Sequence, residues 1–221
     1  KITLFHAKVV KDLNSKNENL LIGFHGQTIY HNPKEKISKQ LGNGILLNQL
    51  SRNKVIFNFR KNDILNGGEG APLTPIFHQL ILKQIKIEVP SCILNIGGIS
   101  NVTIVRNYFP FDFTSRDIGP GNCLIDSWVR KNSNQKFDKE GKLALIGKTN
   151  EIILEQAQEL YSNRTNQKTL SLDVNDFDVS FARGLSLEDG AATLTDFTGR
   201  IIGAALFTLL SNVREKLFRV L

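Results

Sequence analysis

The sequence predicts an α/β protein in which strands alternate with helices. Apolar residues recur at helical spacing in residues 2–13 and 191–210, while short β-prone apolar runs occupy residues 20–24 and 54–59. A third signal is the strand, glycine pair and strand pattern of residues 91–118. Because no internal repeat interrupts this alternation, we expect two α/β halves whose glycine turns face a cleft.

The first part of the chain opens with the amphipathic helix 2–13. It continues through a polar loop (14–19), a buried strand (20–24), a turn at Asn32-Pro33, a helix (41–50), a strand (54–59) and a helix (77–87). Residues 60–75 are rich in glycine, asparagine, aspartate and proline, which predicts a long loop of the kind that often carries function. Because Glu88-Val89-Pro90 follows a helix and precedes a new strand, we expect the first domain to span residues 1–88.

The second predicted domain, residues 89–221, carries its strands first and its helices afterwards. The strands of 91–118 lead to a helix over 122–131, a polar insertion at 138–141, a helix around 151–161 and an irregular polar segment over 165–178. Ser186 or Asp189 is expected to cap the last helix, which is rich in small residues.

Composition narrows the classes of function. The formal charge is +7, but the basic residues are dispersed without a dense run or a basic–aromatic alternation, so we expect no nucleic-acid partner. Cys92 and Cys123 form neither a disulfide framework nor a metal-ligand pattern, and no apolar stretch approaches a membrane span, so a cytoplasmic protein without a metal site is expected. The chain lacks methionine and begins at Lys1, from which we expect a piece of a longer protein.

Asp117 lies in the segment that points most directly to chemistry, RDIGPGN at 116–122. One proline stiffens the backbone here, and two glycines leave it without side chains. The carboxylate lies just before a predicted helix, and the partial positive charge at the helix N-terminus favours the ionised form that a general base requires. The alternative is a loop aspartate that satisfies its own turn. Asp117 lies several residues too early to cap the helix.

A glycine pair, Gly97 and Gly98, separates two predicted strands. This pattern is also a common hairpin signal, and most such hairpins hold no ligand. In the functional interpretation, a backbone without Cβ atoms approaches a phosphate closely, and Asn95, Ser100 and Asn101 add donors. Both interpretations stay open on these residues alone.

Two further segments gather polar side chains. His25, Gln27 and Thr28 surround a glycine at a strand end, where a histidine serves either as a hydrogen-bonded structural residue or as part of a site. Arg60 and Glu69 belong to the glycine-rich stretch, and a planar guanidinium suits a carboxylate or ring hydroxyls. The alternative for Arg60 is a solvated surface arginine.

In their order along the chain, these motifs resemble those of the anhydro-N-acetylmuramic acid kinase family. The matching segments are GFHGQTIYHNP (23–33), FRKNDILNGGEGAPLTPIFH (59–78), LNIGGISNVT (94–103), DIGPGNCLIDSW (117–128) and LSLEDGAATLTDFTGRIIG (185–203). The resemblance implies an actin-like, hexokinase-type ATPase (ribonuclease H-like) fold of two α/β domains, truncated here at both ends. It also implies a cytosolic kinase of cell-wall recycling, in which water opens the 1,6-anhydro ring of anhydro-N-acetylmuramic acid while O6 receives the γ-phosphate of ATP.

The resemblance further implies a role for each matched residue. Asp117 corresponds to the aspartate base that activates water, and Arg60 to a sugar-contacting arginine. The other sugar-site residues implied are His25, Gln27, Thr28 and Glu69, and the nucleotide phosphates are assigned to Asn95, Gly97, Gly98, Ser100, Asn101, Gly119, Gly121 and Asn122. The implied partners are the anhydro sugar, ATP with Mg²⁺ that comes with the nucleotide, and a second copy in a homodimer.

The chain also departs from the family pattern. No Met-Ser-Gly-Thr-Ser-x-Asp-Gly phosphate loop precedes the matching segments, and no Gly-Gly-Gly-x-x-Asn adenosine motif follows them. Asn58, Arg116 and Ile118 stand where the family usually has an aspartate, an aromatic residue and a threonine. Two alternatives therefore stay open: a catalytically dead truncated copy, and a non-enzymatic sugar-binding or nucleic-acid-binding module.

Overall fold

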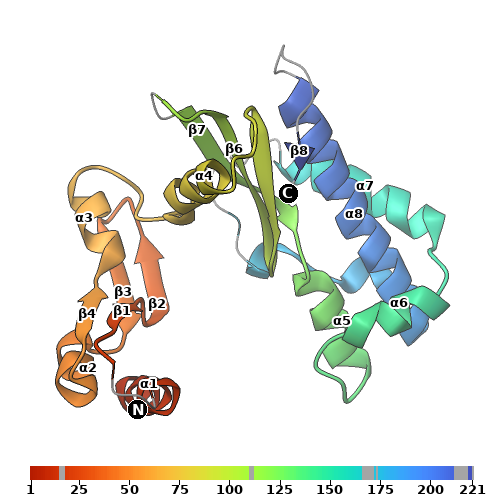
Figure 1. Ribbon diagram of the computed structural model, residues 1–221. Coiled ribbons are helices and arrows are strands. Elements are labelled where there is room, and N and C mark those ends of the chain that lie inside the picture. Colours follow the sequence, from red (N-terminus) through yellow and green to blue (C-terminus); the bar gives the residue numbers. More distant parts are fainter. Residues whose placement is uncertain (15–17, 110–111, 166–171, 173, 212–218, 221) are drawn as a thin grey trace. The chain divides into compact units, whose positions relative to one another are not determined.

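The chain folds into two compact units, which we call unit 1 (Lys1–Thr74) and unit 2 (Pro75–Leu221). The computed structural model describes all residues except 15–17, 110–111, 166–171, 173, 212–218 and 221 (Figure 1). Both units contain helices and strands, which confirms the α/β class. The domain limit expected after residue 88 concerns the domains of the complete fold and stays a prediction.

Unit 1 combines helices with two small sheets. Strands β1 (Leu21–Phe24) and β4 (Lys54–Phe57) pair in parallel, whereas β2 (Gln27–Asn32) and β3 (Ile37–Leu41) form an antiparallel hairpin. The helices described here are α1 (Ile2–Leu13), α2 (Gly44–Ser51) and α3 (Phe59–Leu65). The predictions of α1, α2, β1 and β4 are confirmed as elements, but β1 is not the buried strand expected, because Phe24 is the one buried residue of its four. The β2–β3 hairpin was not expected, apart from its turn after Asn32.

Helix α3 corrects the prediction of a continuous loop over 60–75. Asn58 adopts a left-handed conformation (φ 60°), which asparagine tolerates, and the next seven residues contain no glycine or proline to break a helix. The glycine-rich loop begins only after this helix, where Asp63 accepts a hydrogen bond from the Gly70 N–H at 2.7 Å. Arg60 therefore lies on a helix, and Glu69 lies on the loop that Asp63 holds.

Unit 2 is built on a sheet with the strand order β7-β6-β5-β8 (Figure 1). Strands β5 (Ser91–Ile96), β6 (Ile99–Asn107) and β7 (Asp112–Pro120) are antiparallel, and β8 (Arg219–Val220) pairs in parallel with β5. The helices are α4 (Thr74–Gln84), α5 (Cys123–Asn132), α6 (Lys142–Ile146), α7 (Glu151–Thr165) and α8 (Leu187–Ser211). All were predicted except α6, which lies just beyond the expected polar insertion.

Helix α8 holds unit 2 together. It contacts α5, α6, α7 and β7, and its buried side chains enter two apolar clusters. One cluster includes Trp128, Leu154, Leu194 and Phe197, and the other includes Cys92, Val102, Ile104, Ile118 and Ile202. The Ser186 hydroxyl oxygen accepts the Asp189 N–H at 3.0 Å, which confirms Ser186 as the cap.

Helix α8 also corrects one statement from composition. It is long and apolar enough to cross a membrane by length and hydropathy alone, so the expectation that no apolar stretch approaches that length is wrong. Core helices of globular proteins share this property, and the packing of α8 in two apolar clusters is that of a core helix.

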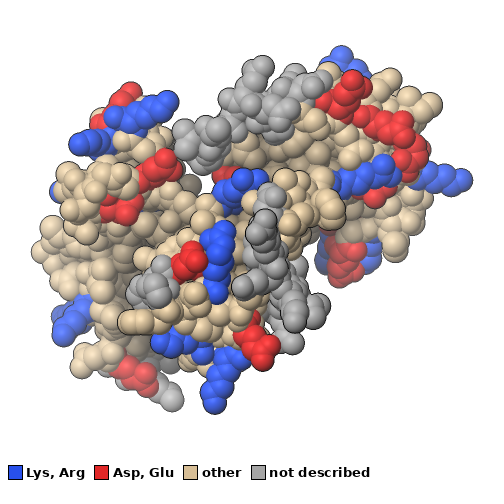
Figure 2. All heavy atoms as spheres, turned by 90° about the horizontal axis from the view of Figure 1, so that it is seen from above, with Lys and Arg blue, Asp and Glu red and all other residues tan. Residues whose placement is uncertain are grey.

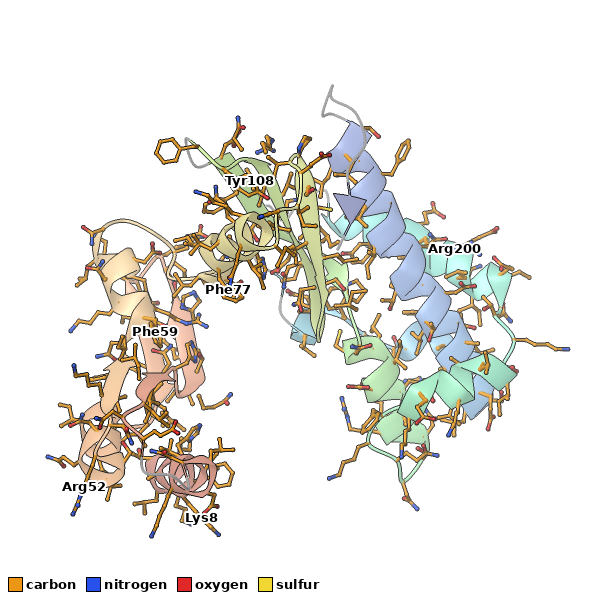
Figure 3. All side chains as sticks on the ribbon, viewed as in Figure 1. Lys8, Arg52, Phe59, Phe77, Tyr108 and Arg200 are labelled. Carbon is orange, nitrogen blue, oxygen red and sulfur yellow. The ribbon has the colours of Figure 1, made fainter. Side chains whose placement is uncertain are left out.

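Charged side chains of both signs are interspersed over the face shown in Figure 2. One ion pair joins two helices of unit 2: Arg200 of α8, labelled in Figure 3, reaches both carboxylate oxygens of Glu151 at 2.8 and 3.1 Å. Both side chains are exposed, so this pair contributes little to stability.

Candidate functional site

The glycine turn between β5 and β6 packs onto the start of α5. The Gly97 carbonyl accepts the Asn122 N–H at 2.7 Å, and the Gly98 carbonyl accepts the N–H groups of Gly121 at 2.9 Å and Cys123 at 3.3 Å. Three consecutive N–H groups, which lie just before and at the start of this helix, therefore donate to the turn. A buried bond from the Ser100 hydroxyl to the Pro120 carbonyl (2.9 Å) adds a further link.

The glycines of this region fall into two classes. A Cβ at Gly121 would lie 2.2 Å from the Gly97 oxygen, and one at Gly119 would lie 2.6 Å from Ile201 Cγ2, so both positions must be glycine for the segments to pack. A Cβ at Gly97 or Gly98 would instead meet the nearest atoms of the described residues at ordinary distances of 3.6 to 3.7 Å. Neither Gly97 nor Gly98 has the left-handed φ that glycine supplies to hairpin turns.

The predicted phosphate-binding residues lie together in unit 2, but with different exposure. Asn95, Gly98 and Asn122 are exposed, Gly97 and Asn101 are partly exposed, and Ser100, Gly119 and Gly121 are buried. Asn95 and Asn101 face each other across β5 and β6, and the Asn122 side chain donates to the Ile96 carbonyl at 3.4 Å. The three buried residues fix the turn, while the others leave a polar surface around it.

Asp117 lies within β7, three residues before the strand ends at Pro120. It is opposite Asn101 in the β6–β7 register, next to an irregularity between Ser100 and Asn101. Its Oδ2 accepts the backbone N–H of Leu172 at 2.8 Å. This bond spans 55 residues, so Asp117 does not satisfy a local turn, and one carboxylate oxygen is held by a distant segment of unit 2.

In unit 1, Arg60 and His25 form a hydrogen-bonded pair. The Arg60 Nε–H donates to His25 Nε2 at 3.0 Å, while His25 Nδ1 lies 3.0 Å from the Gly26 carbonyl. Because arginine only donates, His25 Nε2 accepts and Nδ1 carries the ring proton. Burial lowers the pKa of Arg60, which is partly exposed and held rather than freely solvated.

His31 lies within the electrostatic influence of Arg60 and was not among the residues predicted from the sequence. Burial lowers the pKa of His31, the nearby Arg60 cation lowers it further, and Glu69 acts in the opposite direction. His31 Nδ1 lies 3.1 Å from Ser38 Oγ, and Gln40 Nε2 donates to both Ser38 Oγ (2.7 Å) and Thr28 Oγ1 (3.3 Å). His25, His31, Arg60 and Glu69, with Thr28 linked through this network, form what we call the unit 1 cluster.

Gln27 differs from the other predicted sugar-site residues. It pairs with Leu41, whereas Thr28 pairs with Gln40, so the two neighbouring side chains lie on opposite faces of the hairpin. The structure thus brings together His25, Thr28, Arg60 and Glu69, and separates Gln27 from Thr28. The predicted contacts with sugar and phosphate stay predictions.

No three His, Cys, Asp or Glu side chains are placed to hold a metal ion among the residues that the structure describes. Cys92 and Cys123 are both buried free thiols, and burial raises the pKa of each. Each unit therefore offers its own candidate region: the unit 1 cluster has charged and hydrogen-bonding side chains that suit a polar organic ligand, and the glycine turn of unit 2 has amide side chains beside backbone without Cβ atoms, which suits phosphates.

Known proteins resemble this chain in sequence over nearly its whole length. Residues 3–218 match the family model described as anhydro-N-acetylmuramic acid kinase. Proteins carrying that name are 52% identical in Pelagibacter ubique (218 residues, 98% of this chain), 38% in Methylobacterium nodulans (93%) and 40% in Gluconobacter oxydans (93%). The chain spans only 56 to 59% of the length of these three relatives. With its motifs in order and the family model matched from residue 3 to residue 218, the chain belongs to the anhydro-N-acetylmuramic acid kinase family.

Proposed function

We propose that this chain is part of a kinase that opens the 1,6-anhydro ring of anhydro-N-acetylmuramic acid and phosphorylates O6 with ATP, in the cytoplasmic recycling of cell-wall sugar. Family membership supports this proposal. The observation that carries it is the glycine pair Gly97-Gly98, which neither backbone conformation nor packing against the described residues requires. A turn without Cβ atoms where the fold would accept them is suited to close approach of a phosphate group.

Asp117 is the general base in this proposal. The Leu172 N–H fixes Oδ2, which orients the carboxylate so that Oδ1 takes a proton from water. The water oxygen bonds to the anomeric carbon C1, and the C1–O6 bond breaks. O6 then bonds to the γ-phosphorus as the bond from that phosphorus to the β,γ-bridging oxygen breaks, so ADP leaves. Positioning and electrostatics supply most of the catalysis in such a transfer.

The phosphates of ATP are assigned to the exposed part of the glycine turn. Asn95, Asn101 and Asn122 offer amide donors beside the open backbone of Gly97 and Gly98. In this proposal Ser100, Gly119 and Gly121 act indirectly, since they are buried and hold the turn against α5. Mg²⁺ is proposed to arrive with ATP, where it neutralises charge on the phosphate oxygens.

Arg60 is proposed to contact the sugar, with His25, Thr28 and Glu69 around it, and Gln27 on the other face of the hairpin is the weakest member of that set. An actin-like, hexokinase-type fold and a homodimer belong to the same proposal, because both follow from the family. They concern the complete protein, of which this chain spans a part.

The test uses a chimera in which residues 1–221 replace the matching part of the Pelagibacter ubique relative. The chimera should transfer phosphate from ATP to anhydro-N-acetylmuramic acid, measured as ADP release and as the phosphorylated, ring-opened product. A well-folded chimera without turnover contradicts the proposal and favours a catalytically dead copy. The 221-residue chain is assayed in parallel, and turnover by that chain alone would show that it needs no further segment.

Two variants of the chimera test the assigned roles, and a third serves as a control. Asp117→Asn should preserve sugar binding and abolish most turnover, because an amide cannot take the proton from water. Asp112→Asn makes the same chemical change at the exposed start of β7 and should leave turnover unchanged. Near-normal turnover of Asp117→Asn removes Asp117 from the base role. Arg60→Ala should mainly weaken sugar binding, and unchanged affinity rejects that assignment.

A further inference from the structure

His31 lies on the Thr28 face of the hairpin because β2 contains a bulge. The register pairs Thr28 with Gln40 and His31 with Ser38, with an irregularity between Thr28 and Tyr30. Gln40 and Ser38 are two residues apart on β3 and share a face, so Thr28 and His31 share one too. Without the extra residue Ile29, a separation of three would place them on opposite faces.

Neighbouring side chains hold the His31 ring in place. Its Nδ1 lies 3.1 Å from Ser38 Oγ, and Ser38 Oγ in turn accepts from Gln40 Nε2 at 2.7 Å. Since the serine oxygen accepts from the amide, its own proton is available to His31 Nδ1. In the neutral ring the other nitrogen, Nε2, then carries the proton and is a hydrogen-bond donor.

The charges around His31 define what this donor suits. The Arg60 cation and the Glu69 carboxylate are both close enough to influence the ring, and burial with Arg60 favours the neutral form. Arg60 uses its Nε–H on His25 and keeps further N–H donors on its Nη atoms. A guanidinium beside a neutral N–H donor is a suitable pair for a carboxylate, while Glu69 can accept from sugar hydroxyls.

We propose that His31 determines specificity in the sugar site: together with Arg60 it binds the lactyl carboxylate that distinguishes a muramic acid from a glucosamine. This inference rests on the proposed function, because it assumes that unit 1 binds the anhydro sugar. It adds a residue and a ligand group to that site. The bulge in β2 is the device that brings the residue there, as bulges next to sites often do.

The experiment compares two sugars on the 221-residue chain. Anhydro-N-acetylmuramic acid and 1,6-anhydro-N-acetylglucosamine, which lacks the lactic acid ether, are titrated by isothermal calorimetry. The wild-type chain should bind the acid at least tenfold more tightly. His31→Ala should reduce that preference by roughly tenfold or more, because it lowers the affinity for the acidic sugar alone. This is the loss expected when a hydrogen bond to a charged group is removed.

Two further variants separate recognition from folding. His31→Gln keeps an N–H donor near the position of Nε2 and should restore most of the preference. Tyr30, on the same strand as His31, donates a hydrogen bond from its hydroxyl to Glu35 in the turn; Tyr30→Phe removes that bond and should leave both affinities unchanged. Amide NMR spectra of the variants verify that the hairpin is intact, and His31→Gln carries the test if His31→Ala unfolds it.

The proposal is overturned by any of three results: His31→Ala lowers the affinity for both sugars equally, His31→Gln has the same affinities as His31→Ala, or the wild-type chain binds both sugars equally well. Turnover by the chimera is measured separately, so that failure of this inference can be told apart from failure of the proposed function. A preference that depends on His31 without turnover contradicts only the kinase proposal, whereas turnover with a preference that ignores His31 contradicts only this inference.

Discussion

Replacing Gly121 by alanine should destabilise unit 2 strongly, although it adds a single methyl group. The new Cβ would lie 2.2 Å from the Gly97 oxygen and 3.0 Å from the Gly97 carbon, so backbone must move. That movement stretches two backbone hydrogen bonds, from the Gly121 N–H to the Gly98 carbonyl (2.9 Å) and from the Asn122 N–H to the Gly97 carbonyl (2.7 Å). Overpacking costs about 1–3 kcal/mol and each weakened bond about 1 kcal/mol, which together give about 3–5 kcal/mol.

Trp128 makes this prediction measurable, because it is the only tryptophan and is 4% exposed in unit 2. Urea and thermal unfolding followed by its fluorescence report on the unit that holds Gly121. A loss of about 3–5 kcal/mol corresponds to a fall in melting temperature of roughly 6 to 20 °C for a protein of this size. The slope of the free energy of unfolding against urea should stay unchanged.

Gly98→Ala is the matched control, since among the residues that the structure describes its Cβ would meet Val174 Cγ2 alone, at 3.7 Å. It should leave the free energy of unfolding within about 1 kcal/mol of the wild type. In the chimera the same variant should weaken ATP binding, because the added methyl group obstructs the open backbone. The reasoning is refuted if Gly121→Ala unfolds like the wild type, or if Gly98→Ala is destabilised as much as Gly121→Ala.

Three further predictions concern the packing of unit 2. Gly190→Ala would place a Cβ 2.2 Å from the Trp128 ring, so it should lower stability by about 1–3 kcal/mol and shift the Trp128 emission; an unchanged spectrum contradicts this packing. Burial raises the pKa of Tyr161 to about 12 from 10.0, so folding favours its neutral form and stability should fall between pH 10 and 12, by no more than about 3 kcal/mol. Tyr161→Phe should remove that part of the alkaline loss in a urea titration, and equal pH profiles of the two proteins argue against it. Arg200→Ala should change stability by less than about 1 kcal/mol, because its pair with Glu151 is exposed, and a larger loss in thermal unfolding shows that the pair matters.

Much of the secondary structure could be predicted because its signals are local. The period of apolar residues identified α1, α7 and α8, and β-prone runs identified β1, β4 and the strands of the large sheet. The error over residues 60–75 arose from composition, since the glycines at 67, 68 and 70 were allowed to define the whole segment. The seven residues before them form α3, and this places Arg60 on a rigid element.

Candidate residues could be found from motifs, but their individual roles could not. Four glycines near the predicted phosphate site look alike in the sequence, and only their neighbours separate Gly97 and Gly98 from Gly119 and Gly121. His31 was missed because the β2–β3 hairpin was not predicted, and because period-two alternation carries no signal of the bulge that brings His31 to the Thr28 face.

The sequence by itself determined the α/β class, most helices and strands, and the ordered motifs that place the chain in its family, because each depends on residues close together along the chain. The tertiary structure alone decided three features: which glycines have space for a Cβ atom, which face of the hairpin His31 occupies, and which group hydrogen-bonds to Asp117. These depend on contacts through space, such as the Leu172 N–H that reaches Asp117 across 55 residues, and no local pattern encodes such a distance.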